Sequence, residues 1–291
     1  MDCNKRSGID LHIHSTASDG SLQPSEILSM AQELNLSAIS ITDHDTIDGL
    51  KEAIEYGIPP SLKVLTGVEI SVSPPDGFSL SGSMHILGYG FAPDDPLLNQ
   101  ALEKLRFSRE NRNPKIIERL NELGMKISME EVIRDLHVRG QLGRPHIASF
   151  MVKRSFSASI DDAFKKYLGN GKPAYVDKYR LDCATAVEII RGAGGIPVLA
   201  HPKLLPLNND NQLEALVLKL TQMGLQAIEA YYPEHHPDDT ARYVYLAKKH
   251  GLMMTGGTDF HGALKPDICM GSGKGDFFVP YELYERLLDS K

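Results

Sequence analysis

The sequence DLHIHSTASDG, residues 10–20, joins an alternating apolar stretch to a turn of small and polar residues. His12 and His14 lie two positions apart. Successive side chains of an extended chain point to opposite faces, so both imidazoles project from one face of the predicted strand. A single pair of this kind is weak evidence in a chain with 11 histidines. Its meaning depends on what the other predicted strands carry.

Short β-branched runs alternate with helical patterns over most of the remaining chain, for example at 24–35, 48–56 and 281–288. This alternation predicts an α/β protein with a parallel sheet, either doubly wound or closed as a barrel. In both arrangements ligands bind at the carboxyl ends of the strands. The predicted strands are Ile9–His12, Ala38–Thr42, Lys63–Ile70, Met84–Gly90, Ile196–Ala200, Gln226–Tyr231 and Leu252–Gly256.

The pattern changes between residues 94 and 171, where no strand-like run is visible. Apolar residues at helical spacing predict helices over 97–105, 116–123 and 160–168, the second of them beginning after Pro114. Ser128 and Glu131 have the spacing of a capping box. We therefore expect an inserted small helical cap domain at 94–171, and a metal-binding barrel built from 1–93 and 172–291.

Composition excludes several classes of protein. With 42% hydrophobic and 24% charged residues the chain can bury a sizeable core and does not resemble a disordered protein. Its net charge of −7 argues against binding duplex nucleic acid through a broad basic face. Without an apolar run of about eighteen residues or an apolar leader, we expect a cytoplasmic protein that does not contact the membrane and has no obligate protein partner. Its three cysteines lack a CxxC spacing and are expected to be reduced thiols.

Imidazoles and carboxylates recur near the ends of nearly all the predicted strands. Neutral imidazole and carboxylate are ligands of zinc, manganese and iron. Any one histidine could be structural, but burying the whole set without partners would cost several kcal/mol for each group, by rough estimate. The set exceeds the three or four ligands of one ion, so it predicts more than one metal. Beyond His12 and His14 it comprises His44 in TDHD, Glu69 in GVEIS, His85 at the start of the fourth strand, His201 in AHP, and Asp259 and His261 in GGTDFH.

The motifs DLHIHSTASDG, TDHDT, GVEIS, HILGYG, AHP and TDFH resemble, in order and spacing, those of the PHP (polymerase and histidinol phosphatase) superfamily of metal-dependent phosphoesterases. With GRPHIA, GKPAYV and YYPEHHP, the chain is similar to the branch of stand-alone nucleotide phosphatases and 5′–3′ exoribonucleases. The resemblance spans nearly the whole sequence. It implies a distorted (βα)7 TIM-like barrel that holds up to three metals at its C-terminal face.

The resemblance also implies a ligand set for each ion, with two or three divalent ions of manganese, zinc or iron as cofactors. Asp19 stands where several relatives have histidine, which favours a harder metal such as manganese at the third site. One of the carboxylates that flank His44, Asp43 or Asp45, is expected to orient a metal-bound imidazole. The first ion would take His12, His14, Glu69 and Asp259, the second Glu69, His85 and His201, and the third Asp19, His44 and His261.

An acidic protein needs local cations to bind a small phosphorylated substrate. Arg109 and Arg112 lie three positions apart on a predicted helix, a spacing that equally fits a solvated helix face. Arg144 in GRPH and Lys172 in GKP lie in loops, and in similar proteins these segments approach a second phosphate. Paired hydrogen bonds from guanidinium suit that role. His146 is a further candidate for substrate contact, or it packs the cap against the barrel.

Catalysis is expected from Glu69, Asp259 and His235. Two metals that share a bridging carboxylate can activate water for attack on a phosphate ester. The leaving oxygen then needs a proton, and His235, in a loop after the sixth predicted strand, is the candidate donor and substrate contact. His201 is a poorer donor, because a metal-bound imidazole has given up its lone pair.

We therefore expect a metal-dependent phosphoric monoester hydrolase that converts a nucleoside 3′,5′-bisphosphate to the 5′-monophosphate and phosphate. Trimming of short RNA from its 5′ end is expected as a further exonuclease activity. The alternatives are a phosphatase for another small ester such as histidinol phosphate, and a non-catalytic metal-binding module. The module is disfavoured because every matched ligand position holds a competent side chain. Metal-dependent amidohydrolases also carry HxH, but no strand-end lysine stands out here to bridge two ions.

Overall fold

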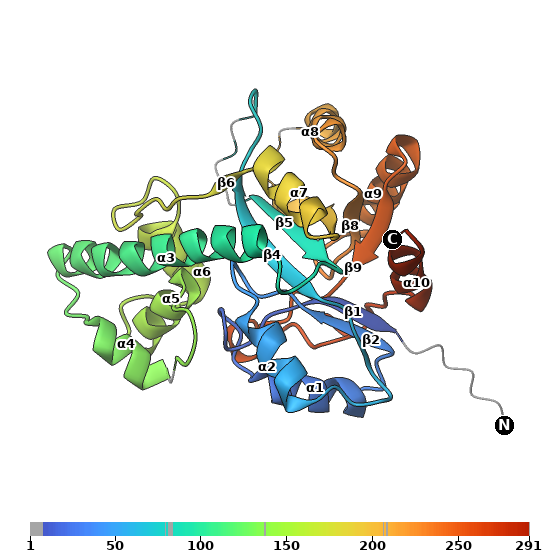
Figure 1. Cartoon of the computed structure of the whole chain (residues 1–291). Helices are drawn as coiled ribbons and strands as arrows, with labels where there is room; N and C mark the ends of the chain where they lie inside the picture. Colours follow the sequence, from blue (N-terminus) through green and yellow to red (C-terminus); the bar gives the residue numbers. More distant parts are fainter. Residues whose placement is uncertain are drawn as a thin grey trace.

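The computed structural model describes residues 8–78, 80, 84–136, 138–205, 207 and 209–290. Its strands form a three-stranded sheet in the order β1-β2-β3 and a six-stranded sheet in the order β6-β4-β5-β7-β8-β9 (Figure 1). The strands are β1 Ile9–Ile13, β2 Ala38–Ile41, β3 Lys63–Val64, β4 Gly67–Ser73, β5 Met84–Tyr89, β6 Leu181–Asp182, β7 Ile196–Leu199, β8 Ala227–Tyr231 and β9 Met253–Gly256.

Backbone hydrogen bonds join the two sheets along two seams. At one seam His14 N–H donates to the carbonyl of Phe260 over 2.9 Å, next to an isolated bridge between Ile13 and Phe260. At the other, Asp45 N–H donates to the carbonyl of Glu69, also over 2.9 Å. Seven strands, β1, β2, β4, β5, β7, β8 and β9, thus follow one another around a distorted TIM-like barrel whose closure consists of bridges and not of continuous ladders.

The strand β5 runs antiparallel to both of its neighbours, β4 and β7, so the expectation of an all-parallel sheet is wrong at this strand. Only residues 74–83 separate β4 from β5, and a parallel crossover needs a dozen or more. This reversal places His85, the second residue of β5, opposite Ser71 near the carboxyl end of β4. The start of β5 therefore lies at the same end of the barrel as the carboxyl ends of the parallel strands.

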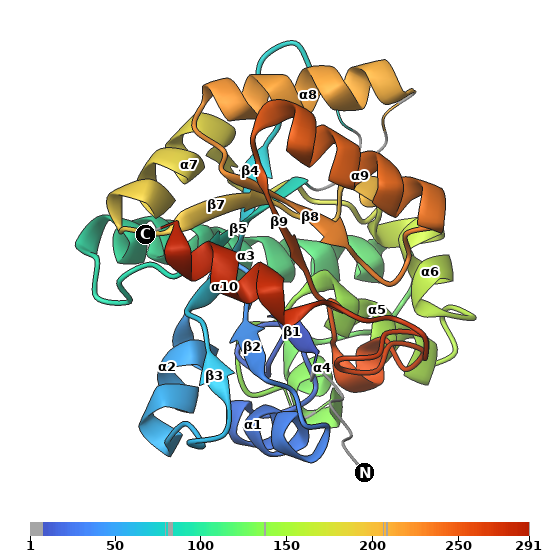
Figure 2. The ribbon, with the colours of Figure 1, turned by 90° about the vertical axis from the view of Figure 1, so that its right-hand side faces the viewer.

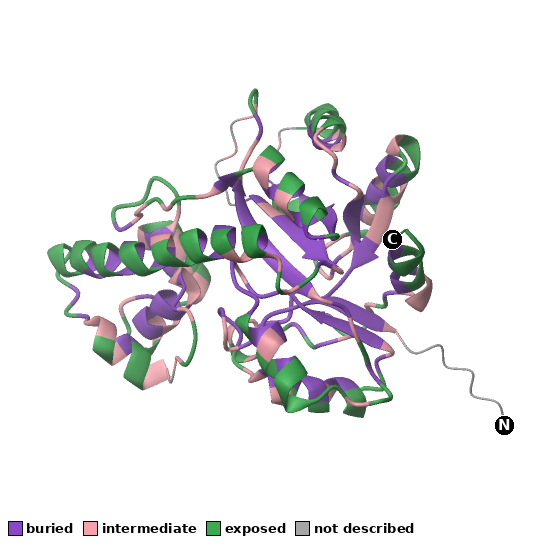
Figure 3. Ribbon diagram, viewed as in Figure 1, coloured by how far each residue is buried: buried purple, intermediate pink, exposed green. Residues whose placement is uncertain are grey.

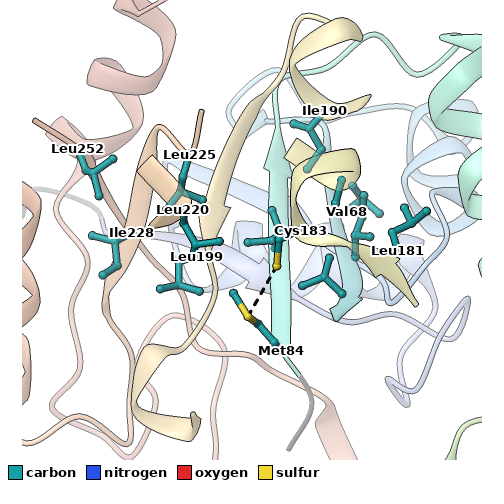
Figure 4. Close-up of a cluster of buried hydrophobic side chains, with 14 of the residues drawn as sticks. Val68, Met84, Leu181, Cys183, Ile190, Leu199, Leu220, Leu225, Ile228 and Leu252 are labelled. Carbon is teal, nitrogen blue, oxygen red and sulfur yellow. Dashed lines mark hydrogen bonds between the residues drawn. The ribbon is translucent and has the colours of Figure 1, made fainter. Parts of the chain in front are cut away.

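Helices cover the outside of the barrel, and the strands are buried between them (Figures 2 and 3). One apolar cluster joins β4, β5, β7 and β8 to α7, α8 and α9, with Leu220, Ile228 and Leu252 among its members (Figure 4). The helices around the barrel are α1 Pro24–Glu33, α2 Asp48–Tyr56, α7 Cys183–Gly192, α8 Asp210–Gln222, α9 Pro237–His250 and α10 Tyr281–Asp289. Two short 3-10 turns, η2 Pro202–Leu204 and η3 Gly262–Leu264, follow β7 and β9.

The helices α3, α4, α5 and α6 lie together at one side of the barrel (Figure 1), and the π-helical turn η1 directly follows α6. They enclose an apolar cluster of their own that includes Ile147, Phe150 and Leu168. This arrangement supports a cap at 94–171, a division that stays a prediction. The elements are α3 Pro96–Glu122, α4 Met129–Leu136, α5 Arg144–Lys153, α6 Ile160–Ala163 and η1 Phe164–Leu168.

The helix α3 runs unbroken through Pro114, so the expectation of two helices here is wrong. Its buried side chains recur at helical spacing on both sides of the proline. Leu102 and Leu105 belong to the barrel cluster, and Ile116 and Leu120 belong to the cap cluster. Burial along this stripe outweighs the cost of about 3 kcal/mol of an interior proline.

Smaller predictions had mixed outcomes. The single strand expected at 63–70 is two strands, β3 and β4, and the two-residue strand β6 was not expected. The capping box is confirmed, since Ser128 Oγ accepts from Glu131 N–H and Glu131 Oε2 accepts from Ser128 N–H. Cys183 and Cys269 are free thiols, and Cys3 lies outside the described residues. No helix in the described ranges has the length and apolar character needed to cross a membrane.

Candidate functional site

The predicted metal ligands converge at the carboxyl end of the barrel, eight of the nine in close groups and the ninth, His201, with its Nε2 2.8 Å from Glu69 Oε1. The described residues contain three groups whose ligand atoms all lie within 4.8 Å of one another. A metal site needs this convergence, because each ion takes its ligands from several strands. The groups are His12, His14, Glu69 and Asp259; His44, Glu69 and His85; and His14, Asp19, His44 and His261.

Glu69 stands at the centre of the cluster, on β4, and its side chain is 1% exposed. One oxygen, Oε2, faces three imidazoles from β1 and the loop after β2, with 3.2 Å to His14 Nε2 and 3.0 Å to His44 Nδ1. The other, Oε1, lies 2.8 Å from both His85 Nδ1 and His201 Nε2. A carboxylate whose two oxygens face separate sets of imidazoles has the geometry needed to bridge two ions.

Asp259 and Asp19 carry the outer parts of the cluster. Asp259 Oδ1 lies 3.1 Å from His14 Nε2, while its Oδ2 accepts hydrogen bonds from Tyr232 and Lys265. Asp19 Oδ1 lies 3.4 Å from His261 Nε2. Each carboxylate therefore has an oxygen directed at imidazoles that come from other segments of the chain.

Several of the facing atoms are buried without a hydrogen-bond partner among the described residues. Buried polar atoms in proteins are nearly always paired, so an unpaired set at one place indicates a missing partner. A divalent cation accepts lone pairs from nitrogen and oxygen together and would satisfy all of them. The donor set thus fits metal ions. The unpaired atoms that face the cluster are His12 Nε2, His14 Nε2, Asp19 Oδ1, His44 Nδ1 and Glu69 Oε2.

The protonation pattern of the cluster also favours a cation. Burial raises the pKa of Glu69, but His44 and His85 outweigh it and hold the pKa well below its usual range. Burial lowers the pKa of His12, but Glu229, Glu69 and Asp259 outweigh it and hold the pKa well above its usual range. Glu69 thus stays charged and favours a proton on His12, while burial lowers the pKa of His44, His85 and His261. A divalent ion would replace the proton on His12.

Strained backbone conformations coincide with the cluster. Asp45, His201 and Asp259 have φ values of 57°, 25° and 55°, in the left-handed region that non-glycine residues rarely adopt. Each lies at the end of a strand, directly beside or among the predicted ligands. Such conformations cost about 1–3 kcal/mol and persist where surrounding structure imposes them, often at functional sites.

Glu229 orients one of the predicted ligands, and sequence analysis missed it. Its Oε1 accepts from His12 Nδ1 over 2.9 Å, and its Oε2 accepts from the backbone N–H of His201 over 2.6 Å. The side chain is fully buried. A proton on His12 Nδ1 leaves Nε2 free for a metal, the arrangement common in metal sites. A lone carboxylate within the apolar strand pattern of 226–231 was the signal that could have identified it.

The carboxylates beside His44 have different partners from those expected. Asp43 accepts hydrogen bonds from Ser15 and Ser18, and Ser18 Oγ lies 3.4 Å from His14 Nδ1. Within the described part of the chain, Asp43 thus reaches an imidazole through Ser18 and not by a direct hydrogen bond. Asp45 turns away from the histidines and pairs with cations.

A cluster of cations adjoins the metal ligands through Asp45. Asp45 Oδ2 lies 2.7 Å from Arg109 Nη2 and 2.7 Å from Lys178 Nζ, which also donates to Ser71 Oγ. Burial and the neighbouring cations Arg109 and Arg144 lower the pKa of Arg112 to about 9. Arg109 and Arg112 are 7% and 4% exposed, which excludes the solvated helix face. We call Arg109, Arg112, Arg144, Lys178 and Arg180 the cation cluster.

The cation cluster carries more positive charge than its carboxylates balance. Asp45 pairs with Arg109 and Lys178, and Asp177 pairs with Arg180. Among the described residues, Arg112 and Arg144 have no carboxylate partner; they donate to the side-chain oxygen of Asn113 and the carbonyl of Leu168. Sequence analysis missed Lys178 and Arg180, because nothing in their local pattern separates them from surface cations.

A cavity of about 450 Å³ opens beside the cluster, lined by Arg144, Arg180 and residues from the end of β4. The guanidinium of Arg144 lies 5.5 Å from the ring centre of Phe164 and 5.6 Å from that of Tyr175. Both rings line the cavity. Aromatic walls with adjacent cations suit a nucleobase joined to a phosphate.

The remaining candidates, Lys172, His146 and His235, are not members of the cation cluster, and the charges that act on His146 are those of Asp19 and His261. Lys172 is exposed and does not line the cavity. His146 is 6% exposed, its Nδ1 accepts from Gly143 N–H, and burial lowers its pKa. His235 donates from Nδ1 to the carbonyl of Ala230 in its neutral form, and its buried Nε2 has no described partner.

Comparisons with known proteins agree with this geometry. Residues 10–130 match the PHP domain family. The chain is 33% identical to a 3′,5′-nucleoside bisphosphate phosphatase of Chromobacterium violaceum, over 87% of each chain. It is 33% identical to the 5′-3′ exoribonuclease Rnm of Escherichia coli, over 87% of this chain and 84% of that one. A solved structure described as a metal-dependent phosphoesterase from Bifidobacterium adolescentis superposes with a TM-score of 0.83 at 28% identity, covering 97% of this chain and 96% of the other.

Proposed function

Because the chain belongs to the PHP family of metal-dependent phosphoesterases, we propose that it removes the 3′-phosphate of nucleoside 3′,5′-bisphosphates and leaves the 5′-monophosphate. Trimming of short RNA from its 5′ end is the second part of this proposal. Relatives named for these two activities support it. The observation that carries it is the buried cation cluster. Two of its members, Arg109 and Lys178, pair with Asp45, the residue after His44, so the cluster lies beside the predicted metal ligands.

Two phosphate-binding regions follow from this arrangement. The first would be the metal cluster, with His12, His14, Glu69 and Asp259 holding one ion, Glu69, His85 and His201 a second, and Asp19, His44 and His261 a third. Metal ions bound there supply charge neutralisation of the phosphoryl oxygens and a water of lowered pKa. Their number, two or three, and their identity as manganese, zinc or iron are part of the proposal.

The second region would be the cation cluster, where Arg112 and Arg144 hold the 5′-phosphate. Both guanidinium groups lack a described carboxylate partner, so a dianionic phosphate would supply the missing negative charge. Lys178 lies between the two regions, because its Nζ donates to Ser71, which is two residues after Glu69 on β4. The rings of Phe164 and Tyr175 would hold the base.

His235 stays in the proposal as a substrate contact near the leaving oxygen. The ring of Tyr232 lies between it and the predicted ligand His201, with ring centres 5.3 Å from His235 and 5.8 Å from His201. Burial lowers the pKa of His235, and Nδ1 donates to a carbonyl. Its Nε2 is then an acceptor at neutral pH and would bind a hydroxyl group of the substrate. The leaving oxygen would take its proton from a solvent water, and the hydroxide left behind would be neutralised by the proton that the attacking water loses.

The test is phosphate release from adenosine 3′,5′-bisphosphate, AMP and histidinol phosphate, together with metal analysis. We expect turnover of the bisphosphate alone, abolished by chelation and restored by manganese. Turnover that survives chelation with no bound transition metal would overturn the proposed mechanism. A preference for histidinol phosphate would support the alternative phosphatase, and no turnover of any ester with manganese would support the non-catalytic module.

The variant Arg144→Ala tests the cation cluster separately. Loss of charge-assisted hydrogen bonds should raise KM for the bisphosphate by about 10–100-fold. KM for an aryl phosphate, which lacks the second phosphate, should stay unchanged. Arg154→Ala is the matched control, because Arg154 also lies in the cap, over the ring of Phe150. Equal losses on both substrates would contradict the proposed role of Arg144.

A further inference from the structure

A groove of about 480 Å³ lies between α3 and residues 176–179, next to the cation cluster. Its walls are largely apolar and include Phe107, Val176 and Tyr179. Phe107 is 65% exposed and Tyr179 is 51% exposed. The segment that carries Tyr179 is held against α3, because its backbone N–H donates to Ser108 Oγ over 2.8 Å. Two exposed aromatic side chains thus face one groove with no use in the proposed reaction.

The groove is continuous with the cation cluster. Arg112 and Lys178, both members of the cluster, line its floor. Asp177 lines both the groove and the cavity beside Phe164 and Tyr175. A ligand that occupies the cation cluster can therefore extend into the groove without leaving the protein surface.

The charge of the cluster suits more than one phosphoryl group at the 5′ position. Four arginines, namely Arg109, Arg112, Arg144 and Arg180, lie with Asp45 and Asp177 as the two carboxylates of the described contacts. RNA that continues from a 3′-phosphate held by metals would leave on the 3′ side, away from the cluster. What enters the groove must instead be attached to the 5′-phosphate, and the apolar walls favour an uncharged, extended group.

Resting on the proposed function, we propose that the enzyme also hydrolyses the 3′-phosphate of nucleotides whose 5′-diphosphate carries a long, uncharged arm. The arm would lie in the groove between Phe107 and Tyr179. In this reaction a water oxygen forms a bond to the 3′-phosphorus and the bond from phosphorus to the ribose oxygen breaks. The ribose oxygen takes a proton, and the products are the 3′-hydroxyl compound and inorganic phosphate. The 5′-diphosphate stays intact.

Coenzyme A is the probe, because it joins a 3′-phosphate, a 5′-diphosphate and a pantetheine arm in one molecule. Phosphate release from coenzyme A and from adenosine 3′,5′-bisphosphate is measured side by side with manganese. The double variant Phe107→Ala/Tyr179→Ala should raise KM for coenzyme A about tenfold, the loss expected when a few methylene groups stay in water. KM for the bisphosphate should not change.

Tyr56→Ala is the matched control, since Tyr56 is 64% exposed on α2 and does not line the groove. Unchanged bisphosphate turnover in the double variant shows that it folds. If the wild-type enzyme hydrolyses the bisphosphate but not coenzyme A, the inference is overturned and the proposed function stands. An equal effect of the double variant on both substrates, or on neither, overturns the role of the groove. Failure to hydrolyse either substrate overturns both proposals.

Discussion

Substitution of Glu229 tests how the protein holds its predicted metal ligands. The carboxylate accepts one hydrogen bond from His12 Nδ1 and one from the backbone of His201, and it has no contact with solvent. Both partners are donors when His12 offers Nε2 to a metal. The variant Glu229→Gln keeps the size of the side chain but has one acceptor oxygen and one NH2 donor, so it satisfies only one of the two partners.

The expected losses follow from these two contacts. One buried donor left unpaired costs about 1–3 kcal/mol in the free energy of unfolding of the metal-free protein. Loss of the group that orients a metal-bound imidazole lowers metal affinity by about 10–100-fold. Glu229→Ala removes both acceptors and leaves a cavity, so both losses should be larger.

Urea unfolding of the metal-free protein measures the first loss, and manganese titration against a competing chelator measures the second. Glu234→Gln serves as the control, because Glu234 is exposed in the loop after β8. If Glu229→Gln unfolds more easily but binds manganese as tightly as the wild type, the residue is structural only. The orientation argument would then be wrong.

Three further outcomes are expected. Asp45→Asn leaves Lys178 buried without its carboxylate and should lower the free energy of unfolding at pH 7 by about 3–5 kcal/mol. The pKa of Asp45 is held well below its usual range. In urea unfolding, the difference in stability between wild type and variant should therefore be constant above about pH 5 and shrink only below about pH 4. Gly257→Ala would place a Cβ 2.3 Å from His12 N, so manganese binding should be lost while the open position Gly192→Ala leaves it unchanged. Manganese should raise the thermal midpoint of the metal-free wild type in a concentration-dependent way, since it binds the folded state, and a midpoint that does not respond in calorimetry would contradict the metal site.

Much of the site could be predicted from residue type and position along the chain. The predicted ligands at strand ends depend on local properties, namely where an apolar run stops and which polar residue follows it. Asp259 is predicted in this way, Glu69 is predicted as a carboxylate inside the apolar run 63–70, and the structure brings both to the same cluster of imidazoles. Their role as metal ligands stays a prediction.

Contacts between segments far apart in the sequence could not be predicted from residue type and position. His12 and Glu229 are 217 positions apart, and Lys178 and Asp45 are 133 positions apart. A lysine in an irregular segment carries no local mark of the partner it will meet. Only the packed structure, which buries both members of each pair, shows that they belong to the site.

The sequence by itself determined the α/β class, the position of most strands and the kind of chemistry, because side-chain alternation and ligand type are properties of short segments. The tertiary structure decided the direction of β5, the continuity of α3 through Pro114 and the assembly of the cation cluster. Strand direction depends on the length of the connection and on the neighbouring edge. Helix continuity depends on how much apolar surface both ends bury. These free energies are sums over residues far apart in the chain, so no local pattern contains them.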